Sequence, residues 1–115
     1  MNSNTDYEYA DGSGNRYILS NNQLRYIPVK PEESSTGTYH GGEPFEISLS
    51  VGQQSELQQI FDNAIAAEQS LTKDRAKMTG LVTKSSQSES VSVILKSNAP
   101  EKEALENALN KLKPN

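Results

Sequence analysis

The chain has 115 residues, a formal net charge of −4 at pH 7 and no cysteine. This length suits one domain, and without cysteine the protein has no disulfides, thiol nucleophiles or thiolate metal ligands. An acidic pI near 5.0 argues against a dedicated nucleic-acid-binding protein, because such a protein needs a basic face to displace counterions. No stretch approaches the roughly 20 apolar residues of a membrane span. The N-terminal residues lack the basic start and apolar run of a signal peptide, but a signal removed earlier would leave the same appearance, so the sequence assigns no compartment.

The first segment, DYEYADGSGNRYILS, predicts a β-hairpin. Tyr7 and Tyr9 fall on one side of a strand, with Asp6 and Glu8 on the other. The stretch DGSGN predicts the turn, because glycine and asparagine adopt positive φ at little cost. Its Asp-x-Ser-x-Asn spacing resembles the start of a calcium loop, but Arg stands at the sixth position and Asn at the twelfth, where Gly and Glu are needed. A hairpin turn is therefore the better interpretation.

A third strand is predicted over 24–29, after the polar turn NNQ. Leu24 and Tyr26 would face opposite to Arg25, Ile27 and Val29. Pro28 cannot donate to a ladder, so this strand lies at an edge or ends near the proline.

Residues 30–44, KPEESSTGTYHGGEP, predict a long polar loop, because they show no apolar periodicity. Loops of this length in compact domains are usually functional or disordered. The loop contains His40, the chain's one histidine, and Glu43 three residues later. Histidine titrates near neutral pH and could act as a base or ligand. One histidine and one carboxylate do not make a catalytic zinc site, which typically takes three protein ligands, and no Gly-x-Ser-x-Gly elbow is present.

The alternation in FEISLSV predicts a half-buried strand over 45–51. A helix should follow, capped by Ser50 and Gln53 at capping-box spacing. Its apolar stripe is predicted to contain Leu57, Ile60, Phe61, Ala64, Ile65 and, at its end, Glu68 or Leu71.

The last third predicts two further strands and a second helix. KMTGLVTK and SVSVILKS read as strands joined by a polar turn, with Val91, Val93 and Leu95 on one face. NAPEKEALENALNKLK predicts a helix capped by Asn98 and Glu101, with Pro100 in its first turn.

These elements predict an α+β domain over residues 1–115, in the order β-β-β-β-α-β-β-α. Each helix has one apolar stripe and must lie on another layer. The simplest arrangement is an antiparallel sheet with both helices packed on one face and a polar opposite face.

The tyrosines are concentrated in one part of the chain. They make up five of the seven aromatic residues and all lie within the first 39 positions: Tyr7, Tyr9, Tyr17, Tyr26 and Tyr39. Cross-strand tyrosine pairs stabilise small sheets, which is the structural interpretation. Exposed tyrosines also anchor partner proteins, peptides or sugars, which is the functional one.

The sequence therefore favours a non-catalytic binding or protein-interaction module acting through the five tyrosines with His40 and Glu43. The expected partner is a protein, a peptide or a small ligand, and no cofactor or metal is expected. One alternative is a small enzyme or metal-binding protein using His40 and Glu43. Another is a structural subunit that buries a sheet face or edge in a homo-oligomer.

Overall fold

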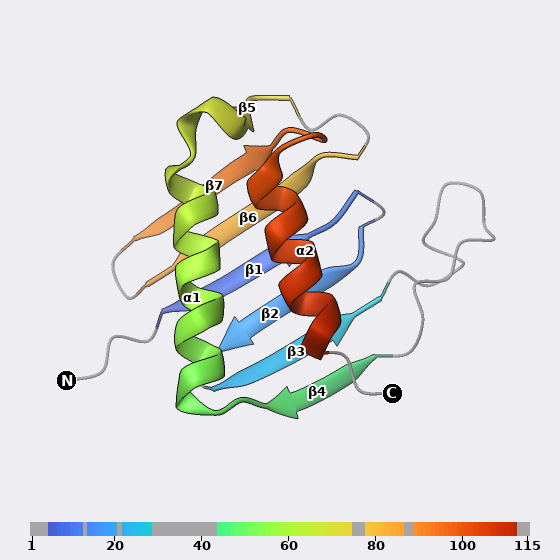
Figure 1. The fold of residues 1–115 in the computed structure, drawn as a ribbon, viewed down its shortest axis with the longest axis vertical. Helices are drawn as coiled ribbons and strands as arrows, with labels where there is room; N and C mark the ends of the chain where they lie inside the picture. The colour runs from blue at the N-terminus through green and yellow to red at the C-terminus, as the bar shows by residue number, and fades with distance from the viewer. Residues whose placement is uncertain are drawn as a thin grey trace.

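The computed structural model describes residues 5–12, 14–20, 22–28, 44–74, 78–86 and 89–112. Seven strands form one antiparallel sheet in the order β4-β3-β2-β1-β6-β7-β5. The strands are β1 (Asp6–Ala10), β2 (Arg16–Ser20), β3 (Gln23–Ile27), β4 (Phe45–Ser48), β5 (Leu71–Thr72), β6 (Gly80–Ser85) and β7 (Ser90–Leu95). The helices are α1 (Val51–Ala66), the short 3-10 helix η2 (Glu68–Ser70) and α2 (Pro100–Leu112). The predicted α+β class with an antiparallel sheet is confirmed (Figure 1).

The predicted β1–β2 turn is closed by Asp11 and Asn15. The carboxylate of Asp11 accepts from the backbone and side-chain N–H groups of Asn15 at 2.9 and 3.0 Å. Gly14 takes the positive φ, 96°, that the turn requires. Both carboxylate oxygens of Asp11 are thus engaged by the turn itself, which supports the hairpin interpretation of DGSGN. The following turn uses Asn22 at φ 64°.

The predicted strand over 45–51 is too long at its C-terminal end. β4 ends at Ser48, and Val51 begins α1 with 78% of its surface exposed. The reason is the predicted capping box. The Ser50 side chain accepts from the backbone N–H of Gln53, and the Gln53 side chain accepts from the N–H of Ser50. The capping box therefore starts the helix at Val51, although the apolar alternation of the sequence continues to that residue.

The chain differs from the prediction again at the end of α1. The helix stops at Ala66, and Leu71 does not extend its stripe but pairs with Leu95 as part of β5. This edge strand of two residues is an addition to the predicted order. The second helix starts at Pro100, and the Ala99 carbonyl accepts the first helical bonds, so the predicted cap residue Asn98 lies one position too early.

The side chains of β1 show how the helices lie. Tyr7 and Tyr9 point to the same side of the strand because they are two residues apart. The Tyr7 hydroxyl donates to Asp62 of α1 at 3.0 Å, and the Tyr9 hydroxyl donates to Glu106 of α2 at 2.5 Å. Both helices therefore contact the sheet from the side that carries these tyrosines, and Figure 1 shows them side by side across the strands.

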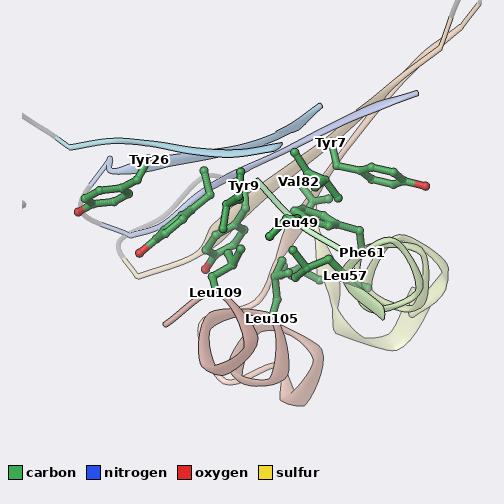
Figure 2. Close-up of a cluster of buried hydrophobic side chains, with 14 of the residues drawn as sticks. Tyr7, Tyr9, Tyr26, Leu49, Leu57, Phe61, Val82, Leu105 and Leu109 are labelled. Carbon is green, nitrogen blue, oxygen red and sulfur yellow. The ribbon is translucent and has the colours of Figure 1, made fainter. Parts of the chain in front are cut away.

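The core fills the space between this face and the helices (Figure 2). Its largest fully buried side chains, each under 2% exposed, are Tyr9, Leu19, Leu24, Leu57, Phe61, Val82, Leu95, Leu105 and Leu109. The tyrosine rings come from the strands, Phe61 comes from α1, and the leucines of both helices pack beneath the tyrosines. Within the described ranges, no layer of this kind covers the other face of the sheet.

Candidate functional site

Four of the tyrosines predicted to bind a partner lie in the core. The exposed fractions are 4% for Tyr7, 0% for Tyr9, 5% for Tyr17 and 3% for Tyr26. Their alternation was predicted correctly, but it places them on the covered side of the sheet. The expectation that these four rings offer exposed area to a partner is therefore corrected. The structural interpretation, cross-strand aromatic pairing, describes them instead.

The rings form a row across four neighbouring strands. Tyr9 and Tyr17 have centroids 6.3 Å apart, Tyr17 and Tyr26 4.8 Å, and Tyr26 and Phe45 5.3 Å. These separations are those of favourable aromatic pairs. The row runs from β1 to the edge strand β4 and holds the strands in register.

The hydroxyls of the two β1 tyrosines are used within the fold. Glu106, which accepts from Tyr9, also lies 3.2 Å from the ammonium of Lys102, which is only 8% exposed. Burial and then the hydrogen bond to Asp62 raise the pKa of Tyr7. Sequence reasoning missed both networks. The i, i+4 spacing of Lys102 and Glu106 was the available signal, but it does not reveal that the lysine is buried.

The remaining predicted site residues, Tyr39, His40 and Glu43, lie outside the described residues, as does all of the predicted loop except Pro44. Within the described ranges, no group of three or more histidine or acidic side chains could hold a metal ion. In the same ranges, no helix is long and apolar enough to cross a membrane.

A hollow of about 650 Å³ lies where α1 and η2 approach the start of α2. Its main polar contact is a hydrogen bond of 2.5 Å from the Ser70 hydroxyl to Glu101. This bond, followed by a backbone hydrogen bond, lowers the pKa of Glu101. A carboxylate with a lowered pKa is a weaker base, so the pair is poorly suited to activate a serine. We interpret it as a link between η2 and α2.

The side of the sheet turned away from the helices carries a more extensive surface, which we call the open face. On the six longer strands, its members are Asp6, Glu8, Ala10, Arg16, Ile18, Ser20, Gln23, Arg25, Ile27, Glu46, Ser48, Leu81, Thr83, Ser85, Ser90, Ser92 and Ile94. Among the described residues, no helix or second sheet packs on it. Sequence reasoning predicted a polar surface here.

Hydrophobic side chains occupy one row of the open face. The strand pairing places Ile94 opposite Leu81, Leu81 opposite Ala10, Ala10 opposite Arg16, and Arg16 opposite Ile27. We call Ile27, Ala10, Leu81 and Ile94 the apolar row. All four are half-buried, although the helices lie on the other side. The predicted polar face is thus only partly polar.

Charged and polar side chains make up most of the neighbouring rows, in which Ile18 is the one aliphatic residue of the open face. Arg16 donates to Glu8 at 2.6 Å, and Arg25 pairs with Glu46 at 3.0 Å. The hydrogen bond to Glu8 raises the pKa of Arg16. Further along the sheet, Ser20 donates to Asp6 at 2.8 Å, and the hydroxyls of Thr83 and Ser92 lie 3.2 Å apart. The open face therefore combines an apolar row with an adjoining polar surface whose charges are largely paired.

Comparison with protein-family models, curated proteins and solved structures gave no match for this chain.

Proposed function

We propose that the chain is a non-catalytic protein-interaction module that binds a partner protein through the open face of the sheet. The proposal keeps the class of function that the sequence favoured and moves the site from the buried tyrosines to the opposite side of the same strands.

The observation that carries the proposal is the apolar row. Scattered exposed aliphatic side chains are ordinary on protein surfaces. Here Ala10, Leu81 and Ile94 lie on three adjacent strands in direct cross-strand register, and Ile27 continues the row beyond Arg16. Contiguous apolar surface rimmed by polar residues is typical of interaction sites.

The surrounding polar residues suit a protein partner. Interfaces commonly have an apolar centre and a polar rim, with arginine enriched and lysine depleted. Arg16 lies within the row on β2, between Ala10 and Ile27, and Arg25 lies beside the row on β3. Both arginines are exposed. Their partners Glu8 and Glu46 hold them in place, which reduces the side-chain entropy that binding would cost.

The test is a double variant, Leu81→Ser with Ile94→Thr, compared with Val51→Ser. The double variant shortens the apolar row, and threonine preserves the β-branched shape that the strand favours. The control removes an exposed valine from the first turn of α1, away from the open face. A partner isolated with the intact chain and then purified should bind the double variant about tenfold or more weakly, because hot-spot side chains contribute more than about 1.4 kcal/mol each. It should bind the control unchanged.

Amide chemical shifts of the complex would locate the contact. The proposal predicts changes over β1, β2, β6 and β7. Equal affinity of the partner for the double variant and the intact chain would contradict it, as would shift changes confined to the helices.

A further inference from the structure

The outer edge of β7 is not blocked in the way that edge strands of monomeric proteins usually are. We infer that a second copy of this chain pairs there, β7 against β7, and extends the sheet across a twofold axis. This inference concerns the edge of the sheet and not the open face, so it can be tested independently of the proposed function.

Strand pairing defines the length of this edge. β5 covers only the C-terminal end of β7, where Leu71 pairs with Leu95 and Thr72 with Ile94. The N-terminal limit is the turn from β6, closed by the bond from the Ser86 N–H to the Glu89 carbonyl at 2.8 Å. Residues 90–93 lie between these limits, and among the described residues no strand pairs with their outer side.

One hydrogen bond shows which backbone groups of β7 point away from β6. The N–H of Lys96 donates outward to the Ser70 carbonyl at 2.8 Å. Because backbone groups alternate sides along a strand, Ser92 and Ser90 also direct their N–H and C=O groups outward. The edge therefore offers two donors and two acceptors to a further strand.

The two edges of the sheet differ in how they are protected. β4 is short, follows Pro44 and carries the charged Glu46, which are common devices against edge pairing. β7 has the sequence SVSVIL, with no charge, proline or glycine. Val91 is one of three large hydrophobic residues exposed among the described ones, at 43%. An uncharged edge of alternating valines favours pairing over remaining in water.

Pairing of two β7 edges can satisfy all the outward backbone groups of Ser90 and Ser92. If Ser90 pairs with Ser92 of the second copy, and Ser92 with Ser90 of the second copy, four backbone hydrogen bonds form about a twofold axis. Val91 then faces its own symmetry mate at a non-hydrogen-bonded position, where Cα atoms are about 4.5 Å apart. The contact buries the exposed valine and brings no two charged residues directly opposite each other.

The register is tested by disulfide trapping. The natural chain has no cysteine, so Val91→Cys introduces a sole thiol at the predicted axis. A Cα separation of about 4.5 Å permits a disulfide. Under mild oxidation this variant should form a covalent dimer nearly completely, at concentrations where the control Val51→Cys remains mostly monomeric. Equal trapping of both variants would overturn the inference.

The edge itself is tested by proline. Ser92→Pro removes one outward N–H without removing a bond to β6. Its matched control is Ser48→Pro, at an outward-facing position of β4, because the N–H of the next residue, Leu49, donates inward to Asn22. Sedimentation over rising concentration should show the natural chain and the control moving from 12.6 kDa toward twice that mass. Ser92→Pro should remain a monomer.

Two charged variants at Val91 test the same pairing if the proline variant does not fold. Val91→Lys and Val91→Glu should each be monomeric, because like charges would meet at the axis, and mixing them should restore the dimer. A natural chain that is monomeric at every concentration, or a dimer that survives these changes, would overturn the inference.

Discussion

Gly80 leaves no room for a side chain where β6 passes the ring of Tyr9. A Cβ at this position would lie 2.6 Å from Cε1 and 2.8 Å from the hydroxyl of that tyrosine. The ring cannot move away easily, because it is fully buried and its hydroxyl is bonded to Glu106. One glycine thus allows the central strand pair to carry a large aromatic residue.

Gly80→Ala should therefore destabilise the fold by about 1–3 kcal/mol through overpacking. Its control is Gly52→Ala, where a Cβ would have no atom closer than 4.0 Å. Alanine in α1 should be neutral or stabilise by up to about 1 kcal/mol. Urea unfolding of both variants measures the difference in stability. If Gly80→Ala and Gly52→Ala had equal free energies of unfolding, the Tyr9 ring would not exclude a side chain at position 80.

At the scale of elements, β1 is the strand that holds the two layers together. It lies between β2 and β6 and bonds to both helices, through Tyr7 to Asp62 and through Tyr9 to Glu106. Lys84 of β6 reaches the same Asp62 at 3.0 Å and lies 5.4 Å from the Tyr7 ring centroid. The contact between β1 and α1 therefore depends on the protonation of the Tyr7 hydroxyl.

Tyr7→Phe tests this contact. At neutral pH the variant should lose about 1 kcal/mol, the usual contribution of one hydrogen bond, while the ring stays buried. The raised pKa of Tyr7 means that the folded chain holds the hydroxyl proton more tightly than the unfolded chain. Its contribution is complete below the unfolded pKa of about 10 and is lost as the pH rises through the folded value.

Stability measured between about pH 9 and pH 12 should thus fall less steeply in Tyr7→Phe than in the natural chain. Asp62→Asn keeps an acceptor for the hydroxyl but removes the charge, so it should reproduce part of the effect. Parallel curves for all three proteins would contradict the assignment of this contact to Tyr7.

The alternation of residues predicted much of the fold. The alternation around Tyr7 and Tyr9 correctly predicted the first strand and which of its residues share a side. The capping-box spacing of Ser50 and Gln53 correctly predicted where α1 begins. Alternation does not say which side the helices cover, because tyrosine suits both a core and an exposed surface. That choice depends on partners distant in sequence, such as Asp62 and Glu106. The short strand β5 was missed for a similar reason, since Leu71 fits a helical stripe as well as an edge pair.

For the molecule as a whole, the central claim is that one face of the sheet forms the core and the other is accessible. The two faces carry aliphatic residues in different surroundings. Leu57, Leu105 and Leu109 are at most 2% exposed beneath the helices, whereas Leu81 and Ile94 lie half-buried on the open face.

The most direct measurement is the attenuation of methyl NMR signals by a soluble paramagnetic probe. The structure predicts strong attenuation for the methyl groups of Ile18, Ile27, Leu81 and Ile94, and little for the three helix leucines. Equal protection of both sets would mean that another layer covers the open face, and would contradict the proposed binding surface.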